Sequence, residues 1–266
     1  MTRLGARLLV VLIATDVLAA HDLWIEPSAF AAELGEAVAV HLRTGEGFEG
    51  DPVPRDGAAT ARLAVVAPTG ERALAGVEGV DPAGILAPSE PGAHWLVYES
   101  RARRLVLEAG RFERYLRQQG LDAVIARRAA RGESGEPGRE LYQRCAKSLV
   151  TVAGAAAGDG HRPVGCGLEL LLDSSPSVAA AGGAVSLRVR FRRRPLARVL
   201  VSALPRGGAG AALAARTDED GRVSFAVDRP GAWLFKAVHM EPIADSTVEM
   251  DWRSWWASLT LRLEEE

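Results

Sequence analysis

The sequence predicts a mainly β protein, built as two Ig-like or prealbumin-like β-sandwich modules joined by a helical hairpin. Three observations predict this fold class. Short apolar runs alternate with turn-forming residues in both halves of the chain, the apolar spacing changes in the middle, and a weak internal repeat links the halves. Short strands at this spacing, with no helix between them, are typical of sandwiches.

The first module is expected over residues 21–108. Its clearest apolar runs are at residues 37–40, 62–66 and 95–98. Gly, Pro and Asp residues that form turns separate these runs, at residues 68–70, 81–84 and 90–92. We therefore expect antiparallel strands with short connections.

The helical hairpin is expected over residues 109–166. Apolar residues recur three and four positions apart on one face of an amphipathic helix, namely Phe112, Tyr115, Leu116, Leu121, Val124 and Ile125. Gly120 is expected to break this helix into two pieces. A turn follows at residues 132–138, and a second helix is expected to begin near Pro137 and to carry Leu141, Tyr142, Cys145 and Leu149.

The second module is expected over residues 167–266, where apolar residues again alternate or run together. The internal repeat supports this symmetry. An Asp-x-x-Gly turn followed by Pro-Gly-Ala and a Trp-Leu pair occurs within residues 81–97 and again within residues 218–235. The sequence leaves open whether the two modules share one core.

Cys145 and Cys166 are the chain's two cysteines. In an exported protein a lone pair is more often a disulfide than two free thiols, and two cysteines fall short of a structural zinc site. We expect a Cys145–Cys166 disulfide, which stabilises the fold by about 3 kcal/mol in the chain-entropy model.

The first residues, 1–20, predict a secretory signal peptide. Arg3 and Arg7 precede a short apolar run, which small residues follow. This run is far shorter than the ~20 residues of a membrane span, and no later stretch is apolar enough to span a bilayer. We expect a soluble, periplasmic or secreted chain. Cleavage after Ala20 makes His21 the first residue, whereas cleavage after Ala19 leaves Ala20 in front of it, and the sequence supports both.

Motifs of the common enzyme classes are absent. The chain has no Gly-x-Ser-x-Gly, no His-Glu-x-x-His, no P-loop and no dinucleotide fingerprint. Its formal net charge of −2 gives no electrostatic reason to expect nucleic acid as a partner. We expect a protein that is not an enzyme.

His21 is the first candidate metal ligand. As a terminal residue it offers its α-amine and its imidazole together, and an amine with an ordinary pKa near ~7.7 loses its proton easily to a competing metal. Asp22 is a candidate further ligand. The alternative is that residues 22–25 are simply the first strand, with Trp24 in the core.

His239 is the second candidate. It shares a strand face with Trp233, Phe235 and Ala237 and stands beside Met240, a candidate thioether ligand. With His21 it would make a nitrogen-rich site, which favours Cu(II) or Ni(II). The alternative is an ordinary hydrogen-bonded core histidine.

Several segments resemble a known family. They are residues 21–27 directly after the signal peptide, 45–48, 112–121 with Arg127, 142–147, 167–170, 233–240 and 256–260. In this order they resemble a family of exported bacterial domains, domain of unknown function 4198, which is associated with nickel and cobalt uptake (NikM-like). The resemblance implies metal binding at the cell envelope, with His21 and His239 as the best-matching histidines and an envelope metal transporter as the partner.

The expected function is therefore that of an exported metal-binding accessory protein, which captures Ni(II), Co(II) or Cu(II) for envelope uptake or homeostasis. The alternative is a non-catalytic β-sandwich module that binds a protein or glycan partner, with its histidines merely packed. The glycine-rich turns and the tandem sandwiches suit both hypotheses.

Overall fold

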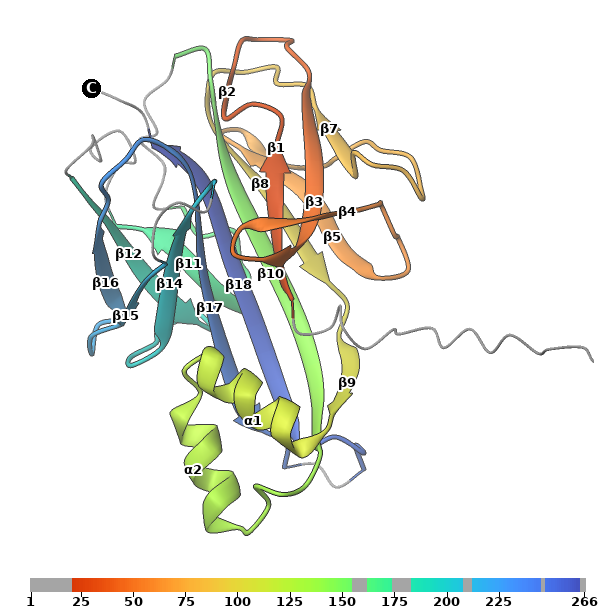
Figure 1. Ribbon diagram of the computed structural model, residues 1–266. Helices are drawn as coiled ribbons and strands as arrows, with labels where there is room; N and C mark the ends of the chain where they lie inside the picture. Colours follow the sequence, from red (N-terminus) through yellow and green to blue (C-terminus); the bar gives the residue numbers. More distant parts are fainter. Residues whose placement is uncertain (1–20, 155–161, 174–182, 208–211, 245–246, 264–266) are drawn as a thin grey trace, which may run out of the picture.

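The computed structural model of the chain describes residues 21–154, 162–173, 183–207, 212–244 and 247–263 (Figure 1). The expected signal peptide lies outside the described residues. The described part is mainly β, as the sequence predicts.

A large sheet, called here the central sheet, carries ten strands in the described part of the chain. Eight of them follow one another in the order β15 (Leu213–Arg216), β14 (Leu200–Pro205), β17 (Gly231–Pro242), β18 (Trp252–Leu263), β10 (Gly138–Val152), β8 (Gly92–Ser100), β5 (Thr60–Ala67) and β6 (Gly70–Ala73). Two short strands, β2 (Ala31–Ala32) and β9 (Arg103–Leu107), also pair with β10. The Pro-Gly-Ala segments of the predicted repeat thus lead into two strands of one sheet, β8 and β17.

Two smaller sheets complete the sandwiches. The N-terminal sheet contains β1 (Asp22–Pro27), β3 (Val38–Glu46), β4 (Glu49–Val53) and β7 (Gly84–Leu86). The C-terminal sheet contains β11 (Leu168–Leu172), β12 (Ala184–Phe191), β13 (Arg194–Pro195) and β16 (Arg222–Ala226). In Figure 1 they lie to either side of the long strands β10 and β18.

The two smaller sheets pack on opposite faces of the central sheet, and β10 shows this most clearly. Successive side chains of a strand point to opposite faces. Cys145 and Leu149 belong to the core beneath the C-terminal sheet. Ala146 and Val150 belong to the core beneath the N-terminal sheet. Each sandwich therefore has its own apolar core, and one sheet serves both.

Two helices cover the end of the central sheet, on the face that also carries the N-terminal sheet. They are α1 (Ala109–Gln118) and α2 (Asp122–Ala130), and they meet at Gly120, where the φ of +64° favours glycine. Tyr115 of α1 stacks on Trp256 with ring centroids 5.5 Å apart. The predicted break of the helix at Gly120 is confirmed.

The predicted second helix, from Pro137 to Leu149, is wrong. These residues form most of β10, which pairs in parallel with β18 and antiparallel with β8 and β9. Apolar residues on both faces of a strand between two cores hide the alternation that identifies a strand. The two sandwiches are consequently fused through one sheet rather than joined by a helical hairpin.

The predicted disulfide is present. Cys145 of β10 is bonded to Cys166, which lies two residues before β11. Because Cys145 faces the core beneath the C-terminal sheet, the bond fastens the beginning of that sheet to the central sheet.

Candidate functional site

His21 lies at the start of β1, where the N-terminal sheet meets the central sheet. Its ring Nε2 is 3.6 Å from Oε1 of Glu46. Glu46 is the last residue of β3 and follows Gly45, which pairs with Asp22 of β1. The backbone carbonyl of His21 accepts a hydrogen bond of 2.8 Å from the Nη2 of Arg144 on β10. The ring is 24 % exposed, so it remains in reach of solvent while its backbone is held.

Asp22 is committed to an ion pair. Both of its carboxylate oxygens accept hydrogen bonds from Nζ of Lys236 on β17, at 2.8 and 2.7 Å. The Asp22 side chain is 7 % exposed. A carboxylate already satisfied in this way fastens β1 to the central sheet.

His239 lies on the other face of β17. Lys236 and His239 are three residues apart on one strand, so their side chains point to opposite faces of the central sheet. The His239 ring packs against Phe191 at 4.5 Å between centroids, and its Nε2 is 3.5 Å from Oε1 of Glu241. Burial lowers the pKa of His239, although Glu241 acts in the opposite direction.

Met240 is buried among the residues beneath the helices, in the cluster that contains Tyr115 and Trp256. It shares the face of Lys236 but stands four residues further along β17, about 13 Å at the usual rise of a strand. The sequence-based hypothesis placed this thioether beside His239, and the alternation of the strand turns the two side chains away from each other.

The structure therefore does not bring the four predicted metal ligands together. His21 and Asp22 lie on the face of the central sheet opposite His239, and Met240 lies further along β17 beneath the helices. In the described residues, one group of three potential ligands converges, formed by Glu99, Cys145 and Cys166. Its two sulfur atoms are joined in the disulfide and are not available as thiolate ligands.

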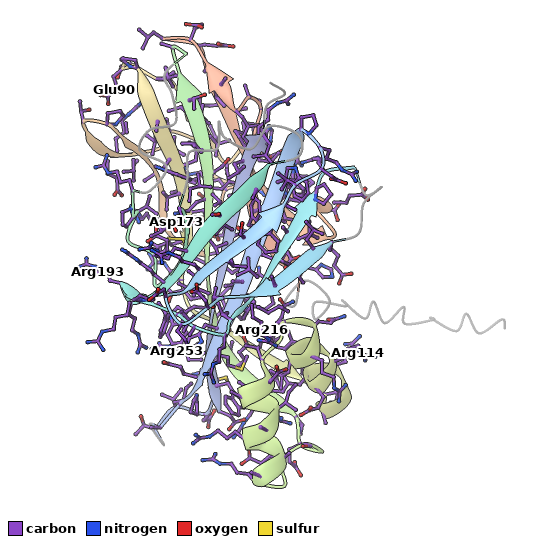
Figure 2. All side chains as sticks on the ribbon, turned by 90° about the vertical axis from the view of Figure 1, so that its left-hand side faces the viewer. Glu90, Arg114, Asp173, Arg193, Arg216 and Arg253 are labelled. Carbon is purple, nitrogen blue, oxygen red and sulfur yellow. A yellow bond between two sulfur atoms is a disulfide. The ribbon has the colours of Figure 1, made fainter. Side chains whose placement is uncertain are left out.

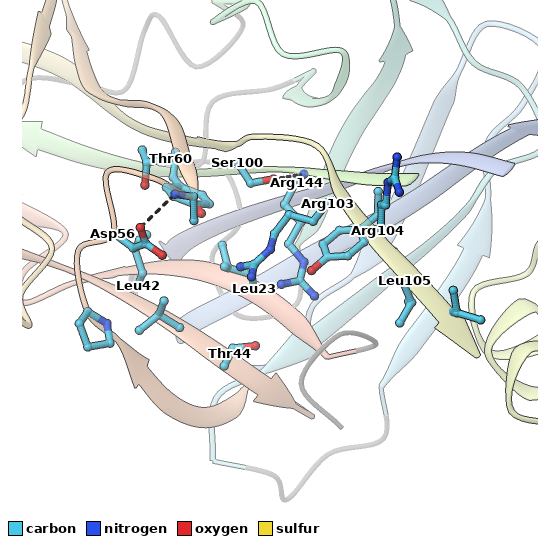
Figure 3. A pocket seen from close by; sticks show the side chains of 16 residues that line it. Leu23, Leu42, Thr44, Asp56, Thr60, Ser100, Arg103, Arg104, Leu105 and Arg144 are labelled. Carbon is cyan, nitrogen blue, oxygen red and sulfur yellow. Dashed lines mark hydrogen bonds between the residues drawn. The ribbon is translucent and has the colours of Figure 1, made fainter. Parts of the chain in front are cut away.

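Sequence reasoning missed a cleft that opens near His21. It has a volume of about 430 Å³ and lies between the N-terminal sheet and the strands β8, β9 and β10. Arg103, Arg104 and Arg144 line it, and we call it the arginine cleft. Figure 3 shows the guanidinium groups of Arg103 and Arg144 turned towards the strand that carries Thr44, while Arg104 points away. Arg103 and Arg104 are adjacent in the sequence, but Arg144 lies 40 positions after Arg104, so no local motif predicts the cleft.

A second arginine-rich surface surrounds Trp255 on the face that carries His239. The guanidinium carbons of Arg192 and Arg253 are 5.1 and 5.9 Å from the centroid of the half-buried Trp255 ring. Arg192 and Arg193 form the turn between β12 and β13 with φ values of 48° and 68°, a left-handed conformation that side chains rarely adopt. Arg193 projects from this turn (Figure 2).

A family model described as "Domain of unknown function (DUF4198)" matches residues 18–241. The chain belongs to this family. The matched range includes β1, both helices, β10 and most of β17, and thus every predicted metal ligand. Membership in DUF4198 agrees with the domain-of-unknown-function family that the sequence resembles, and it supports neither the NikM-like association with nickel and cobalt nor any activity.

No curated protein matches this DUF4198 chain. Similar solved structures include the D0-D1 domain of intimin, with 12 % identity and a TM-score of 0.22, covering 90 % of this chain and 97 % of that one. They also include Salmonella alpha-2-macroglobulin reacted with methylamine, with 12 % identity and a TM-score of 0.23, covering 90 % of this chain and 15 % of that one. Identities and TM-scores as low as these assign neither a topology nor a function to this chain.

Neither helix of the DUF4198 chain, within the residues that the structure describes, is long and apolar enough to cross a membrane.

Proposed function

We propose that the chain is an exported metal-binding accessory protein that captures Ni(II), Co(II) or Cu(II) at His21 once residues 1–20 have been removed. His239, Asp22 and Met240 have no part in this site. The observation that supports the proposal is the contact between the His21 ring and Glu46, at the exposed start of a strand whose backbone is fixed.

The ligands of this site are the α-amine and Nδ1 of His21. A metal ion bound to both atoms closes a compact chelate ring, and each nitrogen is a donor that Cu(II) and Ni(II) prefer. Nε2 then carries the ring proton and points to Glu46, and a carboxylate in that place fixes the tautomer and makes the ring a better ligand. Glu46 is 82 % exposed, so its side chain can shorten the 3.6 Å contact.

Two protein nitrogens leave the remaining coordination positions of the ion to water or to ligands of another protein. That arrangement suits a carrier, because a partner can add its own ligands before the ion leaves His21. An envelope metal transporter is the partner that we propose.

The test is calorimetric titration of the mature chain, beginning at His21, with Ni(II) and Cu(II). We expect His21→Ala and acetylation of the α-amine each to weaken binding by at least about tenfold, and Glu46→Gln to weaken it by about tenfold. His239→Ala is the control and should bind as the unmodified chain does. A loss with His239→Ala, or full affinity after acetylation, would contradict the proposed site.

The second candidate function, binding of a glycan partner, is favoured by the surface around Trp255. An aromatic ring flanked by guanidinium groups suits the sugar faces and carboxylates of an acidic glycan. Polygalacturonate coupled to a column tests this. Retention at physiological salt that Trp255→Ala and Arg253→Glu reduce supports this function, and passage of the unmodified chain without retention contradicts it.

A further inference from the structure

We infer that the arginine cleft binds a small organic carboxylate with an apolar body. This site is separate from the proposed metal site, so either proposal can fail without the other. The argument rests on the volume of the cleft, on the apolar side chains of its walls and on the guanidinium and hydroxyl groups that face into it.

The volume of about 430 Å³ lies within the range of about 300–1,000 Å³ that is usual for small-molecule sites. Leucines line both sides of the cleft: Leu23 and Leu42 on the N-terminal sheet, and Leu105 on β9. Apolar walls of this kind favour a ligand with a hydrocarbon part over a bare inorganic ion.

Arg144 is held in place on the floor of the cleft. Its Nη2 donates to the carbonyl oxygen of His21, and its guanidinium carbon is 5.0 Å from the Tyr142 ring and 5.7 Å from the Trp256 ring. A guanidinium group that is already oriented loses little conformational entropy when it binds a planar carboxylate.

Arg103 supplies the second positive charge. Its side chain is exposed and lies beside Arg144 in Figure 3. Among the described residues, no carboxylate lies within ion-pair distance of Arg103. The acidic group that lines the cleft, Asp56, already accepts hydrogen bonds from the backbone of Ala58 and Ala59 at 2.9 and 3.0 Å. The charge of Arg103 is thus available to a ligand.

Hydroxyl groups complete the polar lining. Burial raises the pKa of Tyr98, whereas the Thr60 hydroxyl and the charges of Arg144 and Arg103 act in the opposite direction. The phenol is therefore protonated at neutral pH and can donate a hydrogen bond to an anion. Together, the two guanidinium groups and the phenol provide hydrogen-bond donors at one place, and leucines surround them. This arrangement matches a ligand that carries a carboxylate on an apolar body.

The experiment titrates the mature chain with phenylacetate and hexanoate, and with their neutral amides, while amide NMR shifts are recorded. We expect saturable shifts at Leu23, Thr44, Thr60 and Leu105 with the carboxylates, and binding of the amides that is at least about tenfold weaker. Inorganic phosphate should bind more weakly than either carboxylate. Equal binding of carboxylate and amide, stronger binding of phosphate, or no saturation by about 10 mM carboxylate would overturn the inference.

Neighbouring arginines provide matched variants. Arg103→Met should weaken phenylacetate binding by about tenfold, because it removes a charged donor that faces the ligand. Arg101→Met, two residues before Arg103, exposed and outside the lining of the cleft, should leave it unchanged. Equal effects of the two substitutions would mean that net charge, and not the cleft, attracts the anion. His21→Ala should leave phenylacetate binding intact, which separates this site from the metal site.

Discussion

At the scale of single residues, the segment from His21 to Trp24 combines two roles. Asp22 and Trp24 are structural: one pairs with Lys236 and the other is fully buried with Phe48, at 5.5 Å between ring centroids. His21 alone keeps an accessible ring. The sequence indicated both a metal-binding role and a structural role for this segment. It could not show which residue has which role, because the partner of Asp22 lies 214 positions away.

The Asp22–Lys236 pair gives the first prediction. Lys236→Met leaves the carboxylate of Asp22 buried without a counter-charge and should lower the free energy of unfolding by about 3 kcal/mol. The double variant Asp22→Leu with Lys236→Met removes both charges and should recover part of this loss. Urea unfolding measures both. A double variant no more stable than the single one would show that the pair is not what fastens β1.

Glu140 gives a prediction about pH. Burial holds the pKa of its carboxyl above the usual range, although the hydroxyls of Ser254 and Tyr115 donate to it and favour the charged form. The unfolded chain loses this proton at a lower pH than the folded chain does. Stability is therefore lost as pH rises from the ordinary carboxyl pKa through the raised one.

Glu140→Gln keeps the accepting oxygen and removes the titration. Its stability relative to the unmodified protein should increase as pH rises through that window and should be constant above it. Thermal unfolding over a series of buffers measures this difference. A relative stability that is independent of pH, or that decreases as pH rises, would contradict the raised pKa of the Glu140 carboxyl.

At the scale of elements, α1 and α2 were predictable and β10 was not. Phe112, Tyr115 and Leu116 follow the helical period because a helix buries one face. β10 buries both faces along residues 145–150, and a strand of this kind has the same apolar pattern as a buried helix. The buried Lys147 adds to the ambiguity, since its partner Glu169 lies on a different sheet.

The contact between α1 and β10 gives the third prediction. A Cβ atom on Gly138 would stand 2.2 Å from the Phe112 ring, so Gly138→Ala should destabilise the protein by about 1–3 kcal/mol. Gly110→Ala is the matched control. It lies within α1 with open space around it and should stabilise the helix by about 0.5–1 kcal/mol. Calorimetric melting temperatures test both, and a harmless Gly138→Ala would mean that α1 does not pack on β10 as described.

At the scale of the whole molecule, the shared central sheet decides how the two sandwiches behave. The sequence predicted two modules, and the structure gives each its own core on one continuous sheet. The pairing of strands across a long connection depends on contacts between residues that are far apart in the sequence. The parallel pairing of β10 with β18 is an example. Local patterns do not contain that information. For the same reason, no local pattern indicates that His21 and His239 lie on opposite faces of the central sheet, or that Arg103 and Arg144 line one cleft.

One sheet with a core on each face should unfold as one unit. Leu187→Ala removes a fully buried side chain beneath the C-terminal sheet and should cost about 2–5 kcal/mol. We expect tryptophan fluorescence and circular dichroism to report a single, shifted urea transition. Two transitions, of which one alone responds to Leu187→Ala, would indicate independent modules.

The central functional claim is that a metal ion binds at the amino end of β1 without His239. Anomalous diffraction at the nickel edge, from crystals of the mature chain soaked with Ni(II), tests it most directly. The account predicts a peak at bonding distance from the α-amine and Nδ1 of His21. A peak beside His239, or no peak at His21, would contradict it.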